Sequence, residues 1–304
     1  MAGLIVICGP TASGKTALAV HLATVFKTPV LSADSRQVYR GFDIGTAKPT
    51  PEERAGVPHY LIDIADPTET YTVAQFQQEA NALIHTFHQQ GITPILVGGT
   101  GLYIQSVTEG LVIPAVAPDP AFREFLGSKS LEELRVELLS KDPETARKIH
   151  PHDRLRTSRA LEVLYRTGET LSSQKRRNPP SYPIIYLGLD TPDRTFLSRR
   201  IELRTQAMLQ KGLLDEIQSI EQQYSENLPL LETLGYREFR QYLGQKCSLE
   251  EAIEQTILHT RQFAKRQTTW FKVNPNILWL DIAHYNFNQL ADEVERSISS
   301  WLSP

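Results

Sequence analysis

Short apolar runs alternate with amphipathic stretches along the N-terminal third of the chain. The apolar runs have the length of buried strands and span residues 4–8, 29–33, 60–64 and 92–97. Residues 15–26 and 72–90 instead place apolar side chains at helical spacing, and Thr72 with Gln75 matches a helix-capping box. This alternation predicts an α/β fold in which helices cover both faces of a parallel sheet.

The pattern changes where three prolines fall within residues 114–120. Helical periodicity without a strand run follows to residue 170, and strand character returns at 184–189. We therefore predict a small all-helical insertion domain at 114–183 within a core formed by residues 1–113 and 184–304. The C-terminal part of the core is expected to be mostly helical, at residues 194–222, 249–272 and 286–302.

Composition and charge limit the possible partners. The 304 residues carry a formal net charge of −3, which argues against a generally basic nucleic-acid-binding protein. Positive charge is nevertheless concentrated in three blocks, residues 154–177, 194–211 and 261–272. Solvated helix faces would explain such blocks, and so would one assembled surface for a polyanion. The two cysteines suit a reducing compartment, and no apolar run approaches the ~18 residues of a membrane span.

A phosphate loop is predicted between the first strand and the first helix. It matches the pattern G-x-x-x-x-G-K-[ST] and consists of Gly9, Pro10, Thr11, Ala12, Ser13, Gly14, Lys15 and Thr16. The glycines let successive amides point toward an anion, the helix N-terminus adds partial positive charge, and Lys15 supplies a cation. The Thr16 hydroxyl suits Mg²⁺. On this motif alone the expected ligand is ATP or GTP, bound by a kinase or NTPase.

Two aspartates that lie in or after predicted strands are candidates for chemistry. Asp34 follows the run at 29–33, at the edge where ligands bind in open α/β sheets, and suits a metal ligand, a general base or a strand-end cap. Asp63 resembles the acid that holds Mg²⁺ in phosphate-loop enzymes, and an exposed strand-end acid is the equal alternative. The residues alone leave these alternatives open.

Several longer segments, which follow one another in a characteristic order, carry a specific resemblance. They are GPTASGKT at 9–16, SADSRQVYRGFDIGTAKPT at 32–50, VPHYLIDIADP at 57–67, LVGGTGLYIQSVTEGL at 96–111, RLRTSRALEV at 154–163, RIELRTQAML at 200–209, ETLGYRE at 232–238 and RQFAKRQTTWFK at 261–272. Together they closely resemble the bacterial tRNA dimethylallyltransferase family, from about residue 5 to residue 272. The series DSRQVYRGFDIGTAKP, GGTGLY and KRQTTWF is the most specific part, because many families share the phosphate loop.

The resemblance implies a phosphate-loop α/β enzyme that modifies tRNA. Its expected reaction moves a dimethylallyl group from dimethylallyl diphosphate to N6 of adenosine 37, beside the anticodon, with Mg²⁺ as cofactor and as a cytoplasmic monomer. In this family the phosphate loop and Arg204 grip the allylic diphosphate, with Lys15 stabilising the departing charge. The resemblance further implies that Asp34 is the general base, that Thr100 lines the reaction channel, and that His59 lies near the site.

Recognition of tRNA is expected from residues beside the reaction site and from the basic blocks. An adenine in an RNA stem-loop must leave its stack before it can react. The expected tRNA-binding residues are Asp34, Ser35, Arg36, Gln37, Thr100, Arg156, Ser158, Arg159, Arg237, Arg261, Lys265 and Lys272. Those that follow Asp34 would read adenine edges, whereas the basic residues of the blocks would contact phosphates.

Three other classes of function compete with this interpretation. A small-molecule kinase would explain residues 9–16, but not the basic blocks or the segments after Asp34. A transferase acting on free AMP, ADP or ATP (an adenylate isopentenyltransferase) would use the same donor, but the helical insertion and the 261–272 block favour a large RNA acceptor. A non-catalytic RNA-binding module would need neither the phosphate loop nor Asp34.

Overall fold

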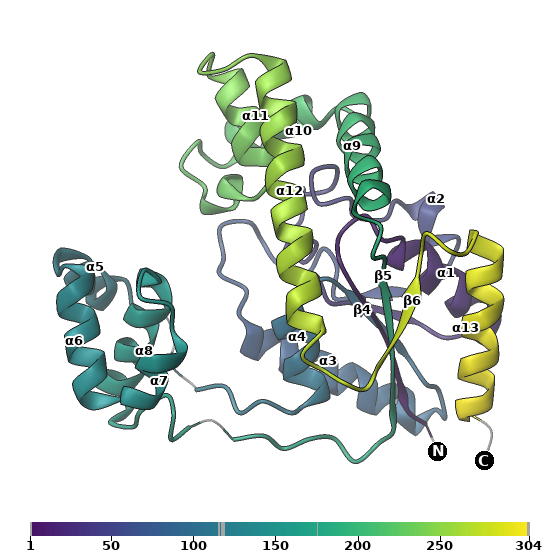
Figure 1. The fold of residues 1–304 in the computed structure, drawn as a ribbon, viewed down its shortest axis with the longest axis horizontal. Helices are drawn as coiled ribbons and strands as arrows, with labels where there is room; N and C mark the ends of the chain where they lie inside the picture. The colour runs from purple at the N-terminus through teal and green to yellow at the C-terminus, as the bar shows by residue number, and fades with distance from the viewer. Residues whose placement is uncertain (1, 115, 117–118, 175, 303–304) are drawn as a thin grey trace. The chain divides into compact units, whose positions relative to one another are not determined.

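The computed structural model describes residues 2–114, 116, 119–174 and 176–302 (Figure 1). Within these residues, six parallel strands form one sheet in the order β3-β2-β4-β1-β5-β6. The strands are β1 (Leu4–Cys8), β2 (Val30–Ser32), β3 (His59–Tyr60), β4 (Ile95–Gly98), β5 (Ile184–Asp190) and β6 (Ile277–Asp281). This confirms the predicted α/β class.

Helices connect the strands and extend from the sheet. They are α1 (Lys15–Phe26), α2 (Pro51–Arg54), α3 (Val73–Gln89), α4 (Gly101–Thr108), α5 (Pro120–Ser128), α6 (Leu131–Lys141), α7 (Pro143–Lys148), α8 (Arg154–Thr167), α9 (Arg194–Gln210), α10 (Leu213–Gln223), the 3-10 helix η1 (Pro229–Glu232), α11 (Tyr236–Leu243), α12 (Leu249–Phe271) and α13 (Phe287–Leu302). The predicted capping box of Thr72 and Gln75 begins α3. None of the helices in the described part of the chain is long and apolar enough to cross a membrane.

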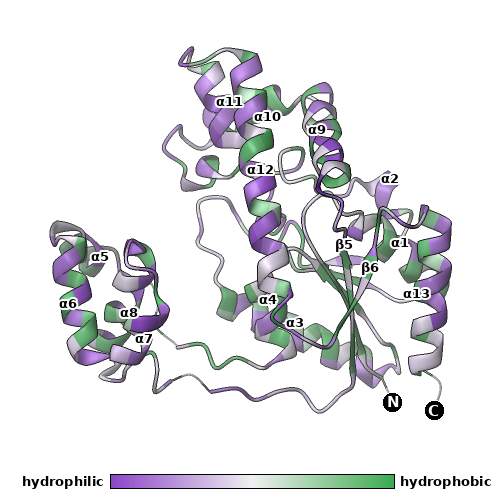
Figure 2. Cartoon of the chain, in the orientation of Figure 1, coloured by the Kyte–Doolittle hydropathy of each residue, from purple (hydrophilic) through white to green (hydrophobic). Residues whose placement is uncertain are grey.

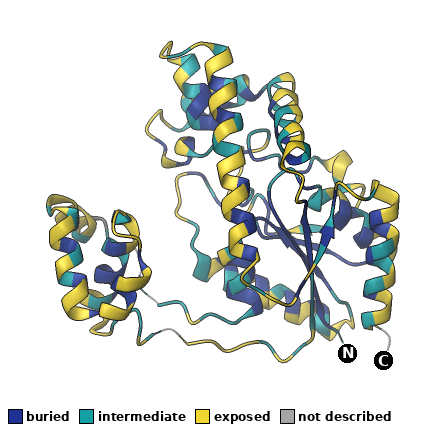
Figure 3. Ribbon diagram, in the orientation of Figure 1, coloured by how far each residue is buried: buried dark blue, intermediate teal, exposed yellow. Residues whose placement is uncertain are grey.

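The sheet is buried between helices. Ile5 and Ile7 of β1 belong to an apolar cluster with Leu22 of α1 and Val294 of α13. Residues that alternate with them point to the other face of the sheet. Figure 1 shows α1 and α13 on one side of the sheet and α3 and α4 on the other. The central strands β1, β2 and β4 are accordingly buried along their whole length, while the outer faces of the helices are exposed (Figure 2 and Figure 3).

The chain divides into two compact units. One contains residues 1–105 and 181–304, and the other contains residues 106–180. The second unit is built from helices α5 to α8 around its own apolar cluster, in which Leu126, Leu134 and Leu161 are buried. Part of the proline-rich segment at 114–120, and Lys175 of the first basic block, lie outside the described residues.

Three sequence expectations need correction. The run at 60–64 is a strand only at its start, because Leu61 and Asp63 adopt left-handed backbone conformations that end β3 at Tyr60. The predicted helix at 194–222 is two helices, since Lys211 and Gly212 separate α9 from α10. The C-terminal part also contains a strand that helical expectation missed, β6, which pairs with β5 at the sheet edge.

Candidate active site

The phosphate loop, residues 9–16, connects β1 to α1 at the carboxyl edge of the sheet. Gly9 has a φ of 138°, and a Cβ there would lie 2.2 Å from the carbonyl oxygen of Leu189 in β5. Only glycine fits this close approach. Gly14 begins α1 in a left-handed conformation without a side-chain cap, so the first amides of this 12-residue helix keep their hydrogen-bonding capacity for an anion.

Two cations, Lys15 of the phosphate loop and Arg204 of α9, line the same cavity. Lys15 Nζ donates to the Pro10 carbonyl at 2.5 Å and to Ser13 Oγ at 3.3 Å. Burial and, to a smaller extent, the charge on Arg204 lower the pKa of Lys15 to about 8, while the carboxylate of Asp34 partly opposes them. Burial also lowers the pKa of Arg204, again opposed by Asp34. An anion bound in this cavity would favour the charged form of both side chains.

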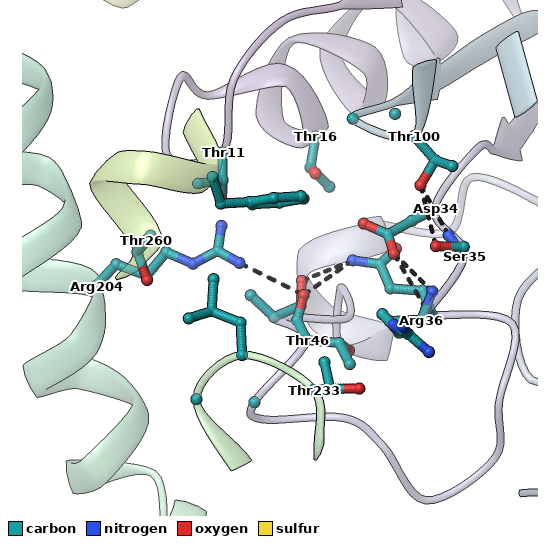
Figure 4. Close-up of a pocket in the computed structure, with 18 of the residues that line it drawn as sticks. Thr11, Thr16, Asp34, Ser35, Arg36, Thr46, Thr100, Arg204, Thr233 and Thr260 are labelled. Atoms are coloured by element: carbon teal, nitrogen blue, oxygen red, sulfur yellow. Dashed lines mark hydrogen bonds between the residues drawn. The ribbon is translucent and has the colours of Figure 1, made fainter. Parts of the chain in front are cut away.

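Asp34 and Thr100 follow neighbouring strands, β2 and β4, and meet at the same edge. Asp34 Oδ1 accepts from the amides of Arg36, at 2.8 Å, and Gln37, at 3.4 Å (Figure 4). Thr100 Oγ1 accepts from the amide of Ser35 at 3.0 Å. These bonds fix the turn after β2, and one oxygen of the Asp34 carboxylate has no bonded partner within it.

A single cavity of about 340 Å³ joins these groups. It is lined by the phosphate-loop residues Thr11, Lys15 and Thr16, by Asp34, Ser35, Arg36 and Gln37, by Thr100, and by Arg204 of α9. Apolar side chains complete the wall and include Val97, Ile201, Met208, Leu234 and Phe263. The cavity therefore offers an anion cradle, a carboxylate and an apolar surface to one ligand assembly.

Gln267 of α12 is a site residue that sequence reasoning did not single out. Its Oε1 accepts from the Thr11 amide at 2.8 Å, and its Nε2 donates to the Gly99 carbonyl at 2.9 Å. The side chain thus ties the phosphate loop to the turn before Thr100. The only available signal is an uncharged residue among the cations of the 261–272 block.

Comparison with known proteins identifies the family of this chain. A family profile described as IPP transferase matches residues 37–274. The chain belongs to the IPP transferase family of tRNA dimethylallyltransferases. It is 57% identical over 279 residues to the tRNA dimethylallyltransferase of Cyanothece sp., with 92% of both chains covered, and 58% identical over 279 residues to that of Acaryochloris marina, also with 92% of both covered.

Solved structures agree with this assignment. The full-length tRNA isopentenylpyrophosphate transferase of Bacillus halodurans superposes with a TM-score of 0.74 at 38% identity, covering 99% of this chain and 96% of that one. A eukaryotic dimethylallyltransferase acting on tRNA gives a TM-score of 0.83 at 30% identity, covering 99% of this chain and 80% of that one. Family members are alkyl-group transferases, so the predicted enzyme class is confirmed.

His59 begins β3 and Asp63 follows it, but the two lie in different environments. His59 lines the cavity, its Nδ1 donates to the Val57 carbonyl at 2.9 Å, and its buried Nε2 has no protein partner. Burial lowers the pKa of His59, which favours the neutral ring at pH 7. Asp63 instead pairs with Lys48 and is not among the cavity-lining residues. Its environment favours the alternative of a strand-end acid over that of a magnesium ligand.

The basic candidates for tRNA contact differ in their availability. Arg261, Lys265 and Lys272 are exposed, although Arg261 pairs with Glu202. Arg237 pairs with Glu238 on α11. In the second unit Arg156 is exposed and Ser158 is half-buried on α8. Arg159 is engaged by the buried Glu162 and by the Val116 carbonyl, an arrangement that stabilises the helical unit.

Proposed function

We propose that the protein transfers the dimethylallyl group of dimethylallyl diphosphate to N6 of adenosine 37 in tRNA. The observation that carries this proposal is the shared cavity, in which the Lys15 and Arg204 cations face the same space as Asp34 and Thr100. A phosphoryl transferase and an alkyl transferase both need an anion cradle. A carboxylate at the far side of that cradle suits a nucleophile that must lose a proton.

The reaction breaks the bond between C1 of the allyl group and the diphosphate oxygen, and the electron pair leaves with the diphosphate. Lys15, Arg204 and the loop amides stabilise that developing charge. The N6 lone pair of adenine forms the new bond to C1, and the proton on N6 passes to Asp34. Ser35, Arg36 and Gln37 line the cavity beside Asp34, where they suit recognition of an extruded base.

Thr16 is the residue that would hold Mg²⁺. Thr16 lines both the 340 Å³ cavity and a second cavity of about 400 Å³, and Lys15 also lines both. Mg²⁺ usually keeps several waters and takes oxygens from substrate phosphates, so one hydroxyl beside a diphosphate cradle fits it. Among the described residues, no group of three His, Cys, Asp or Glu could hold a metal ion alone. Bound with the donor, Mg²⁺ would neutralise part of the leaving group's charge.

Contacts with the tRNA backbone are assigned to the exposed cations on α8 and α12. Arg156, Arg261, Lys265 and Lys272 are all exposed. If they bind phosphates, the logarithm of the tRNA association constant falls linearly with the logarithm of the salt concentration. A salt-independent association constant would argue against phosphate contacts by these residues.

The decisive experiment supplies Mg²⁺ and radiolabelled dimethylallyl diphosphate with unmodified tRNA that carries A36-A37-A38, or with free AMP. We expect label in tRNA and none in AMP. Asp34→Asn should lower kcat at least about 100-fold while tRNA affinity changes little. The matched control is Asp66→Asn, which alters a half-buried aspartate that is not among the cavity-lining residues and whose carboxylate accepts from the amide and hydroxyl of Thr68. Label in AMP, phosphoryl transfer from ATP, or full activity of Asp34→Asn would each contradict the proposal.

A further inference from the structure

One wall of the cavity is an irregular segment, residues 43–48, here called the wall loop. Its residues Gly45, Thr46 and Ala47 line the cavity. The Thr46 carbonyl accepts from Arg204 Nη2 at 3.5 Å and from Gln37 Nε2 at 3.2 Å. Figure 4 shows Arg204 and Thr46 joined in this way. One backbone oxygen therefore contacts a group assigned to the diphosphate and a group assigned to the adenine.

The carboxylate of a residue outside the cavity lining, Glu216 of α10, binds the backbone of the wall loop. Glu216 of α10 accepts from three consecutive backbone amides, those of residues 43, 44 and 45, at 3.1, 2.7 and 3.1 Å. It also accepts from the Tyr236 hydroxyl at 2.6 Å. Hydrogen bonds to an ionised acceptor are stronger than neutral ones. The three bonds from consecutive amides hold the backbone of the wall loop, and the fourth, from Tyr236, orients the carboxylate.

Tyr236 completes this arrangement by packing. Its side chain is fully buried, and its ring lies 4.9 Å from the ring of Phe42. A Cβ on Gly45 would lie 2.4 Å from the same ring, so the backbone passes directly over it. The hydroxyl that reaches Glu216 is therefore fixed by contacts with the wall loop itself.

We propose that Glu216, oriented by Tyr236, is a positioning residue that aligns the two substrates through the Thr46 carbonyl. Glu216 is absent from the described residues that line the cavity, so it acts on the reaction only through the wall loop. The inference rests on the proposed function, since it assigns Arg204 to the donor and Gln37 to the acceptor. Because reacting atoms must meet at close range, a small shift of this wall lowers the reaction rate strongly.

The test compares Glu216→Gln with Glu221→Gln. Glu221 lies on the same helix and pairs with Arg240 at 2.7 Å, so its variant controls for general loss of helix contacts. We expect Glu216→Gln to lower kcat at least about tenfold and to weaken binding of inorganic pyrophosphate. Hydrogen exchange at the amides of residues 43–45 should accelerate. Tyr236→Phe, which keeps the ring, should show a smaller change in the same direction, and Glu221→Gln should change none of these quantities.

Each outcome decides the inference. If Glu216→Gln speeds amide exchange but leaves kcat and pyrophosphate affinity within twofold, the wall loop does not position the substrates. If amide exchange is unchanged, Glu216 does not hold the wall loop. If Glu216→Gln does not fold, Tyr236→Phe decides by the same measurements. If the unmodified protein transfers nothing to tRNA, the proposed function fails, while pyrophosphate affinity in the variants still decides whether Glu216 orders the Arg204 side of the cavity.

Discussion

Replacing Lys15 by Met should make the protein more stable and unable to hold its donor. In the free enzyme burial lowers the pKa of Lys15 from 10.5 to about 8. Each pKa unit corresponds to about 1.4 kcal/mol, so the charged lysine lowers the free energy of unfolding at pH 7 by about 3 kcal/mol. Loss of its hydrogen bond to Pro10 offsets about 1 kcal/mol. We expect a net gain of about 2 kcal/mol, which raises Tm by about 3 °C in a protein of this size.

The dependence on pH provides the sharper measurement. The pKa of Lys15 is lower in the folded protein than in the unfolded chain, so the unfolded chain holds more protons between pH 8 and 10.5. The contribution of Lys15 to stability therefore rises with pH through that window, and the advantage of Lys15→Met should shrink accordingly. Thermal melting at pH 7 and pH 10 tests this, with the exposed Lys246→Met as control. A Lys15→Met protein that melts below the unmodified protein at pH 7, or an advantage that is constant with pH, would refute the reasoning.

Three further predictions concern the same site. The dissociation constant of dimethylallyl diphosphate should rise about fivefold from pH 8 to pH 9, because Lys15 has a pKa of about 8 and loses its proton in this range. Calorimetry measures this constant, and a value that does not change with pH would contradict the assignment of Lys15 to the diphosphate. Gln267→Ala should leave the Thr11 amide and the Gly99 carbonyl without their partner, which lowers the free energy of unfolding by about 1–3 kcal/mol and raises KM for the donor. Thr100→Val should keep the side-chain shape but remove the acceptor of the Ser35 amide, so turnover should fall about tenfold. Unchanged turnover would show that Thr100 has no part in the reaction.

Much of the site was predictable because its residues follow strands directly. The phosphate loop comes after β1, Asp34 after β2 and Thr100 just beyond β4, so local sequence places them at one edge of a parallel sheet. Gln267 was not predictable in this way, because it lies 256 residues from its partner Thr11 and only the packing of α12 brings it there.

Glu216 was missed for a similar reason. It lies about one turn into an amphipathic helix, where an acidic residue normally indicates only favourable interaction with the helix dipole. Its interaction with the wall loop depends on the tertiary position of α10. The strand β6 is a different case, because it was readable from the sequence: ILWL at 277–280 is a short apolar run that follows the turn sequence NPN at 274–276.

The strand order has a consequence for how the chain folds during synthesis. β1 is the first strand to leave the ribosome, yet one of its two neighbours, β5, begins only at Ile184, after the whole helical unit. Until then β1 has one unpaired edge, which is the kind of edge that recruits other chains. The helical unit has an apolar cluster of its own that needs no residue from beyond it. Nascent chains stalled after synthesis of the helical unit but before synthesis of β5 should therefore contain a folded helical unit and an incomplete, aggregation-prone sheet.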